Sequence, residues 1–150
     1  MARRTPNEFQ ESRRQATKLM KRILGQLKVL MDEKLRPYGV TTAQIRLLSA
    51  IRCAPGSSGA HLARQCEVTP QSAQALIQRA EEAGWIVRGK DSVNDRIVTA
   101  SLTPAGDELL KAADRLLRNI ETRLWQDIPQ PAIDNVIAVL AKCALNINQE

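Results

Sequence analysis

Apolar residues between residues 8 and 36 recur at alternating steps of three and four. Met20, Ile23 and Leu27 mark this stripe, and the positions between them are mostly polar or charged. A spacing close to 3.6 residues places these apolar side chains on one face of a helix. Because Pro37 disfavours helical geometry in the residue before it, the pattern predicts a long amphipathic helix over residues 8–36.

Capping signals divide the next segment into three shorter helices. Thr41 is followed three residues later by Gln44, the spacing of a capping box. Either Ser57 or Ser58 is expected to cap a second, short helix. Thr69, which stands before a proline, combines a capping residue with proline at the first helical position and predicts the start of the third.

After Gly84 the period of the pattern changes from 3.6 to 2. Apolar and polar residues alternate over residues 85–90 and 97–102, and a polar loop joins them, which predicts a β-hairpin. Thr103, again before a proline, opens a further helix, and a last amphipathic helix follows two prolines near residue 130.

This order of elements predicts a mainly α fold with a small antiparallel β-hairpin. We expect a single domain over residues 1–150, in which a helix-turn-helix and the hairpin, at 41–102, are flanked by helices at 8–36 and 103–150. A length of 150 residues suits one domain. The outer helices are too long for the middle segment to bury, so their apolar stripes are expected to pair with a second copy in a homodimer. The predicted dimer interface contains Met20, Ile23, Leu27, Leu116, Ile120, Leu124, Ile133, Ile137, Leu140 and Ile147.

The charge of the chain changes the list of expected partners. The net charge is +6, and residues 1–36 carry ten basic against four acidic residues. A basic balance favours nucleic acid or an anionic membrane surface as a partner. No apolar run approaches the roughly 20 residues that cross a bilayer, so we expect no membrane partner and a cytoplasmic protein, associated with the nucleoid when bound to DNA. Three cysteines without a close pair fit a reducing compartment.

The helix that Thr69 opens has two distinct faces. Gln71, Gln74, Ala75 and Gln78 share the face opposite the apolar one, and none of them is charged. Glutamine can make paired hydrogen bonds to adenine in the major groove, and a small residue permits contact with a thymine methyl group. This face is therefore a candidate for base recognition, with an ordinary exposed helix surface as the alternative.

The hairpin offers a second candidate contact. Arg88, Lys90 and Arg96 surround a polar loop at residues 91–95. Arginine on such a tip suits a narrow minor groove, where the negative potential is enhanced. An ordinary solvated turn is the alternative.

Several short motifs carry a family resemblance. They are Leu62-Ala63, Val68-Thr69-Pro70-Gln71-Ser72, Ala83-Gly84-Trp85-Ile86, Asn94-Asp95-Arg96 and Leu102-Thr103-Pro104-Ala105-Gly106. With the helices around them, they resemble the winged helix-turn-helix of MarR-type transcriptional regulators over nearly the whole chain. The resemblance implies a dimeric DNA-binding repressor with no enzymatic activity, and it matches Arg96 to the wing arginine of the family. The chain departs from the family pattern at Ala75, Gln78 and Asn94.

The sequence pattern and the family resemblance together predict a set of DNA-binding residues. Its members are Ser58, Thr69, Gln71, Ser72, Gln74, Ala75, Gln78, Arg79, Arg88, Lys90, Asn94, Asp95 and Arg96. The resemblance also implies a small aromatic or phenolic anion as an effector, bound between the terminal helices and the winged segment. Tyr38, Arg46 and Arg52 lie near the expected junction and are the candidate ligand-binding residues.

Other chemistry finds little support in the sequence. His61 is the one histidine, and its five-residue spacing from Cys66 does not place two ligands on one helix face, so we expect no metal and no cofactor. A redox-sensing regulator that uses Cys53, Cys66 or Cys143 is an alternative, although a free cysteine is more often a small buried apolar residue. A protein-interaction module without DNA recognition and a nonspecific DNA binder are the remaining alternatives.

Overall fold

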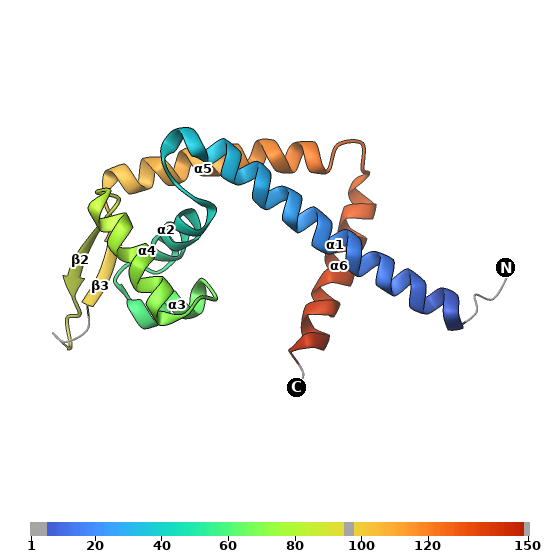
Figure 1. Cartoon of the computed structure of the whole chain (residues 1–150), viewed down its shortest axis with the longest axis horizontal. Helices are drawn as coiled ribbons and strands as arrows, with labels where there is room; N and C mark the ends of the chain where they lie inside the picture. Colours follow the sequence, from blue (N-terminus) through green and yellow to red (C-terminus); the bar gives the residue numbers. More distant parts are fainter. Residues whose placement is uncertain (1–5, 95–97, 149–150) are drawn as a thin grey trace. The chain divides into compact units, whose positions relative to one another are not determined.

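The computed structural model describes residues 6–94 and 98–148. Over these residues the chain is mainly helical, with one small antiparallel sheet, as the sequence predicted (Figure 1). The helices are α1 (Pro6–Leu35), α2 (Thr42–Cys53), α3 (Gly59–Gln65), α4 (Pro70–Glu82), α5 (Pro104–Leu124) and α6 (Gln130–Ile147), with a 3-10 turn at Arg36–Tyr38. The strands are β1 (Ser57–Ser58), β2 (Ile86–Lys90) and β3 (Val98–Leu102). The chain forms two compact units, residues 1–116 and 117–150.

The helix starts in the first unit follow the predicted capping residues. Thr41 and Gln44 form the complete capping box at the start of α2. The hydroxyl of Ser58 accepts a hydrogen bond from the backbone of His61 at the start of α3. Thr69 caps α4 in the same way, with Pro70 at the first helical position. These local signals are strong because a capping side chain satisfies backbone N–H groups that have no partner within the helix.

The sheet has one strand more than the sequence predicted. The order is β1-β3-β2, with Ser57 paired to Ala100 and Ile86 paired to Leu102. The hairpin of β2 and β3 was predicted, but β1 is only two residues long and lies next to a helix start. A segment of two residues is too short to show an alternating pattern, so the sequence could not reveal this strand.

We call residues 42–102, from α2 to β3, the head. Its core is built from α2, α3, α4 and the sheet, and Leu48, Ile51, Leu62 and Ile77 pack together at its centre. Leu47 in α2 and Leu110 in α5 are fully buried. Ile45 and Leu109, which lie close to them in the sequence, are only half-buried.

The join between the sheet and α5 is held by Thr103. Its backbone N–H donates to the carbonyl oxygen of Trp85 (3.0 Å), and its hydroxyl donates to the carbonyl oxygen of Gly84 (2.6 Å). The same hydroxyl accepts a hydrogen bond from the N–H of Gly106 (3.1 Å). At Gly106 a Cβ atom would lie 2.1 Å from the carbonyl oxygen of Trp85. The backbones of α5 and of the segment before β2 therefore touch at a point where only glycine fits.

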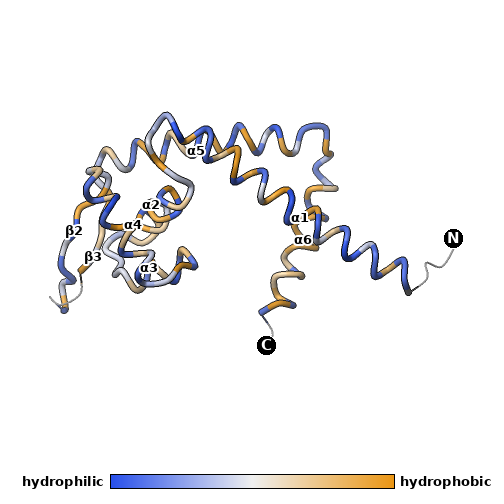
Figure 2. The backbone as a smooth tube through the Cα atoms, in the orientation of Figure 1, coloured by the Kyte–Doolittle hydropathy of each residue, from blue (hydrophilic) through white to orange (hydrophobic). Residues whose placement is uncertain are grey.

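Many apolar side chains of α1 and α6 are exposed within the described part of the chain. Figure 2 shows hydrophobic positions recurring along α1 and through most of α6. Ile23, Ile137, Leu140 and Ile147 of the predicted dimer interface are exposed, and Ile120 is buried. The other members, Met20, Leu27, Leu116, Leu124 and Ile133, are half-buried. No helix in the described part of the chain is long and apolar enough to cross a membrane.

Candidate nucleic-acid interface

A tight turn sets the angle between α3 and α4. Glu67 has a positive φ of 54°, and the N–H of Val68 donates to the carbonyl oxygen of Ala63 (3.0 Å). This arrangement, with a left-handed residue after the helix and a bond reaching back five residues, ends α3 abruptly. The chain can then turn at once into α4, which begins three residues after Glu67.

The start of α4 presents hydroxyl groups to solvent. Thr69 Oγ1 accepts a hydrogen bond from the N–H of Ser72 (3.1 Å) and donates to Ser72 Oγ (2.8 Å). Both residues are exposed. Pro70 has no N–H group and those of Ser72 and Ala73 are bonded to Thr69, so the positive dipole end and the hydroxyl groups are what favour an anion such as a phosphate group here.

The exposed face of α4 is the one that the sequence singled out. Ala73, Ile77 and Ala80 are buried against the head, while Gln71, Gln74, Ala75, Gln78 and Arg79 are exposed. Within α4, Arg79 is the single basic residue, and Glu81 and Glu82 are acidic, so the helix carries a net negative side-chain charge. A helix with one basic and two acidic residues attracts phosphate groups only weakly. Its contacts with a nucleic acid would therefore depend on the glutamine amide groups.

One of these amides already has a partner within the helix. Gln78 Nε2 donates to Glu82 Oε1 (2.9 Å). The i, i+4 spacing of the two residues is visible in the sequence, but the sequence analysis did not use it. Gln74 Nε2 lies 3.5 Å from the position that a Cβ atom would occupy at Gly59, so this side chain rests over the start of α3.

An ion pair joins the β2–β3 hairpin, which we call the wing, to α4. Arg88 Nε lies 2.6 Å from Glu81 Oε2, and both side chains are partly exposed. Arg88 therefore braces β2 against the end of α4, a role that the sequence did not suggest. Lys90 is exposed at the end of β2, and the carboxylate of Asp91 accepts bonds from the N–H groups of Val93 (2.8 Å) and Asn94 (3.0 Å), which shapes the tip. The predicted contacts Asp95 and Arg96 lie outside the described residues.

A separate pocket of about 460 Å³ lies where α1 meets the head. Leu24, Leu27, Met31, Val68 and Leu76 give it an apolar lining, and Lys28 and Arg46 are the cations on its wall. Arg46 also donates to the carbonyl oxygen of Cys66 (3.5 Å). Of the other candidate ligand residues, Arg52 is paired with Asp114 at 2.8 Å, and Tyr38 is exposed outside this lining.

The cysteines differ in exposure, which bears on their reactivity. Cys66 is buried, and this burial raises the pKa of its thiol, which disfavours the reactive thiolate. Cys53 and Cys143 are exposed. No group of three His, Cys, Asp or Glu side chains in residues 6–94 and 98–148 could hold a metal ion.

The short α3, the tight turn, α4 and the β2–β3 hairpin together define a winged helix-turn-helix. The family model described as the MarR family matches residues 38–97. The HTH-type transcriptional repressor Rv2887 of Mycobacterium tuberculosis is 30% identical over 113 residues, which cover 75% of this chain and 81% of that protein. The chain belongs to the MarR family. It is accordingly a DNA-binding transcriptional regulator and not an enzyme.

Other similar proteins agree with this assignment. The multiple antibiotic resistance protein MarR of Escherichia coli is 27% identical over 109 residues, 73% of this chain and 71% of that protein. A crystal structure of an E. coli MarR variant complexed with operator DNA has the same fold, with a TM-score of 0.76 at 22% identity over 85% of this chain and 91% of that one. For MepR of Staphylococcus aureus the TM-score is 0.72 at 21% identity, over 88% of this chain and 98% of that one.

Proposed function

We propose that the protein is a homodimeric repressor that reads a pseudo-palindromic duplex operator with α4 of each copy. The observation that carries this proposal is the exposed face of α4, where Gln71, Gln74 and Gln78 surround Ala75 and no lysine is present. Solvated helix faces usually carry lysine and glutamate, whereas glutamine pairs with adenine and a small residue suits a thymine methyl group. Such a regulator acts on chromosomal DNA, so we expect it in the bacterial cytoplasm.

The remaining candidates take positioning roles in this proposal. The N-terminus of α4, with Thr69 and Ser72, would hold a phosphate group, and Arg79 another. The wing would add contacts through Arg88, Lys90 and Arg96. Ser58, Asn94 and Asp95 are kept as candidate DNA contacts, Asp95 on the sequence alone. Support for the DNA partner also comes from the E. coli MarR variant complexed with operator DNA, and support for repression from the name of the mycobacterial relative.

Substitution of a residue that contacts bases should change DNA affinity differently from substitution of a residue that contacts the DNA backbone. Gln74→Ala is expected to weaken binding by about 1 to 3 kcal/mol at particular base pairs, while Arg96→Ala weakens binding to every sequence. The operator is first selected with the wild-type protein from a pool of randomised duplexes. Fluorescence anisotropy then gives the Kd for this operator, for single base-pair variants and for a scrambled duplex, at one salt concentration near about 150 mM.

The outcomes separate this proposal from its alternatives. A preference for the operator over the scrambled duplex of about 10³ or more is within the range of specific binders and supports it. Equal affinity for both duplexes would indicate a nonspecific DNA binder. No binding to either, with the fold intact, would indicate a winged helix that contacts proteins. If Gln74→Ala lost affinity equally for all base-pair variants, glutamine would not be reading bases.

The pocket between α1 and the head is the proposed effector site. Its apolar lining suits an aromatic ring, and Arg46 suits a carboxylate or phenolate group, whereas Lys28 is paired with Asp32. Of the candidate ligand residues, we keep Arg46 in this site. Arg52 is engaged with Asp114, and Tyr38 stands outside the lining. The ligand would therefore be a small aromatic anion that lowers the affinity for DNA.

A charged and a neutral probe of equal shape test this assignment. Benzoate at saturation is expected to raise the operator Kd by about 5- to 150-fold, the usual range of allosteric coupling. Benzamide, which has the same ring but no charge, is expected to leave the Kd unchanged. Anisotropy titrations at constant ionic strength provide the measurement. Equal effects of the two compounds would contradict a role for Arg46 in recognising an anion.

A further inference from the structure

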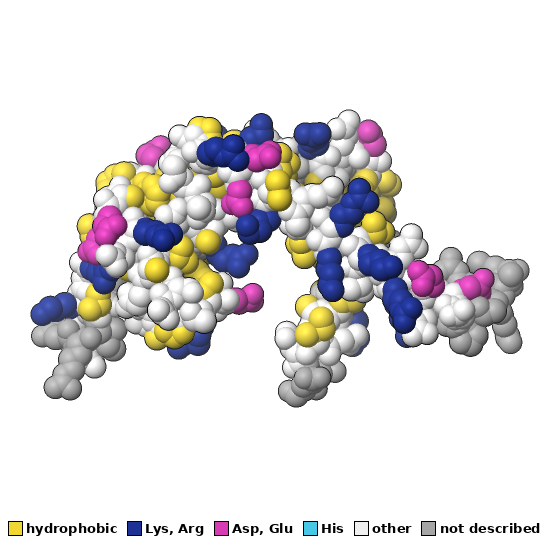
Figure 3. Space-filling model, in the orientation of Figure 1, with side chains coloured by type: hydrophobic (Ala, Val, Ile, Leu, Met, Phe, Trp, Pro, Cys, Tyr) yellow, Lys and Arg dark blue, Asp and Glu magenta, His cyan; other side chains and the backbone are white. Residues whose placement is uncertain are grey.

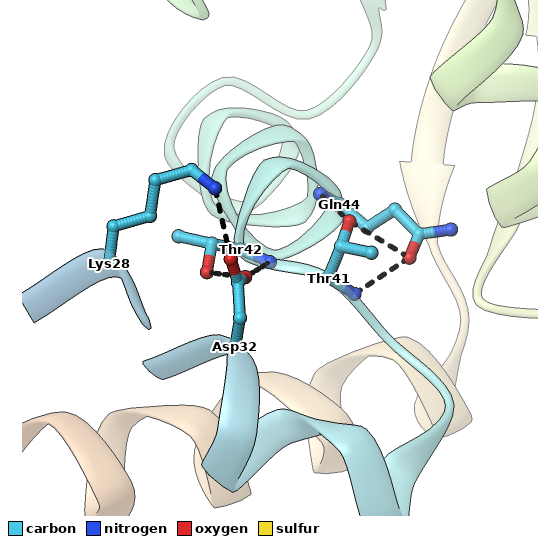
Figure 4. A network of polar contacts seen from close by, with 5 residues as sticks. All are labelled: Lys28, Asp32, Thr41, Thr42 and Gln44. Carbon is cyan, nitrogen blue, oxygen red and sulfur yellow. Dashed lines mark hydrogen bonds and ion pairs between the residues drawn. The ribbon is translucent and has the colours of Figure 1, made fainter. Parts of the chain in front are cut away.

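A carboxylate on α1 is bonded to the first residue of α2. Asp32 Oδ1 accepts hydrogen bonds from the N–H of Thr42 (3.1 Å) and from the hydroxyl of Thr42 (Figure 4). Its other oxygen, Oδ2, accepts a bond from Lys28 Nζ (3.0 Å). The two bonds to Thr42 join residues that are ten positions apart and lie on different helices. Asp32 therefore links α1, which carries part of the predicted dimer interface, to α2, the first helix of the head.

This link is not needed for α2 to form. The backbone N–H groups of Thr41 and Gln44 are satisfied inside α2, by the side chains of Gln44 and Thr41 respectively. The capping box thus starts the helix on its own, as Figure 4 shows beside the Asp32 contacts. What the carboxylate adds is a directional contact between two helices.

Apolar packing also holds the two helices together at this crossing, and the hydrogen bonds to Asp32 add a directional contact to it. Met31, Leu35 and Val40 are buried there, on either side of the 3-10 turn. Apolar contact is non-directional, whereas a hydrogen bond is strong only near its preferred geometry. The hydrogen bonds from Thr42 and Lys28 lower the pKa of Asp32 to about 2, so the carboxylate remains charged, and the link intact, at neutral pH.

We propose that Asp32 is a positioning residue, which fixes the rotation of the head on α1 through Thr42 and thereby sets the half-site spacing that the dimer accepts. The proposal rests on the proposed function, because the rotation of the head affects binding only when two copies read two half-sites. The head turns as one body, since α2 and α4 pack against the same buried cluster around Leu48 and Ile77. Moving one half-site by a single base pair shifts it by about 3.4 Å and turns it by about 34°, which a fixed head cannot follow.

Two matched variants separate this role from the general effect of losing a carboxylate. Asp32→Ala removes the link. Glu33→Ala removes a carboxylate from the next position of α1, where the side chain is exposed and forms no hydrogen bond or ion pair with any described residue. Thr42→Ser keeps both donors to Asp32 and is the conservative variant. Asp32→Leu, which is close to aspartate in size and has no acceptor oxygen for Thr42, replaces Asp32→Ala if the alanine variant does not fold.

The experiment measures the spacing profile of each full-length variant. Operators are made with the half-site separation changed by −1, 0, +1 and +2 base pairs, and each Kd is measured by anisotropy at one salt concentration. For wild type, Glu33→Ala and Thr42→Ser we expect the best spacing to bind at least about tenfold more tightly than its neighbours. For Asp32→Ala we expect this ratio to fall below about threefold, or the optimum to move, while far-UV circular dichroism stays unchanged.

Each outcome decides a different question. A purely structural role would weaken binding to all four duplexes by the same factor, and that result would overturn the proposal. An Asp32→Ala profile identical to that of wild type would also overturn it. If the wild-type protein bound no palindromic operator at all, the proposed function itself would fail, and the positioning role would fail with it.

Discussion

Gly106→Ala is expected to lower the free energy of unfolding by about 3 kcal/mol or more, at the upper end of the range for overpacking. The reason is the approach of two backbones, since the new Cβ atom would lie 2.1 Å from the carbonyl oxygen of Trp85. That oxygen cannot retreat freely, because it accepts the hydrogen bond from Thr103. Thermal unfolding followed by circular dichroism should show a Tm that is lower by roughly 10 °C or more.

Gly25→Ala is the matched control for this prediction. Gly25 lies inside α1, two residues from both Ile23 and Leu27, which puts it on the face opposite the apolar stripe. A Cβ atom there meets nothing within 4 Å. Because alanine is the better residue inside a helix, Gly25→Ala should raise stability by up to about 1 kcal/mol. A Gly106→Ala protein as stable as wild type would show that the backbones separate easily at this point.

Ile137→Asp combined with Leu140→Asp is expected to convert the proposed homodimer into a monomer. These side chains are 59% and 43% exposed within one chain, and they share a face of α6 with Ile133 and Ile147. Two buried carboxylates on that face would be strongly unfavourable in a dimer interface. Light scattering should show 16.7 kDa for the variant and twice that mass for the wild-type protein. Operator affinity should fall by about 100-fold or more, because the two heads no longer bind together.

The polar face of α6 supplies the control for the added charge. Asn135→Asp combined with Asn146→Asp introduces the same two carboxylates at exposed positions. This variant is expected to keep the dimer mass. A double variant of Ile137 and Leu140 that still shows twice the monomer mass would contradict the assignment of α6 to the interface. A wild-type protein with the monomer mass would favour the protein-interaction alternative.

Sequence could predict the features of this fold that depend on neighbouring residues. The caps at Thr41 and Thr69 are local, because donor and acceptor are three residues apart, and both were predicted. The strand β1 was missed, since its two residues become a strand only through pairing with β3. Charged side chains were the hardest to place. Arg52, expected in a ligand pocket, pairs with Asp114, 62 residues away along the chain.

The contrast between local and long-range features also applies to the candidate nucleic-acid interface. The exposed face of α4 could be predicted from helical spacing, and its glutamines are exposed as expected. The ion pair between Arg88 and Glu81 could not, because it depends on how the strand after Gly84 folds back beside the helix. Nor could the link between Asp32 and Thr42, which requires the angle at which α1 meets α2.

The bond between Gln78 and Glu82 has a thermodynamic consequence for DNA recognition. A long flexible side chain that is fixed on binding loses conformational entropy, which opposes association by about 0.5 to 1.5 kcal/mol. Gln78 is already held by Glu82 in the free protein. Its amide nitrogen has a second hydrogen and its carbonyl oxygen remains an acceptor, the two groups that an adenine edge requires. If Gln78 contacts bases as proposed, Glu82 favours one conformation of its side chain in the free protein, and part of this entropy is lost during folding and not during binding.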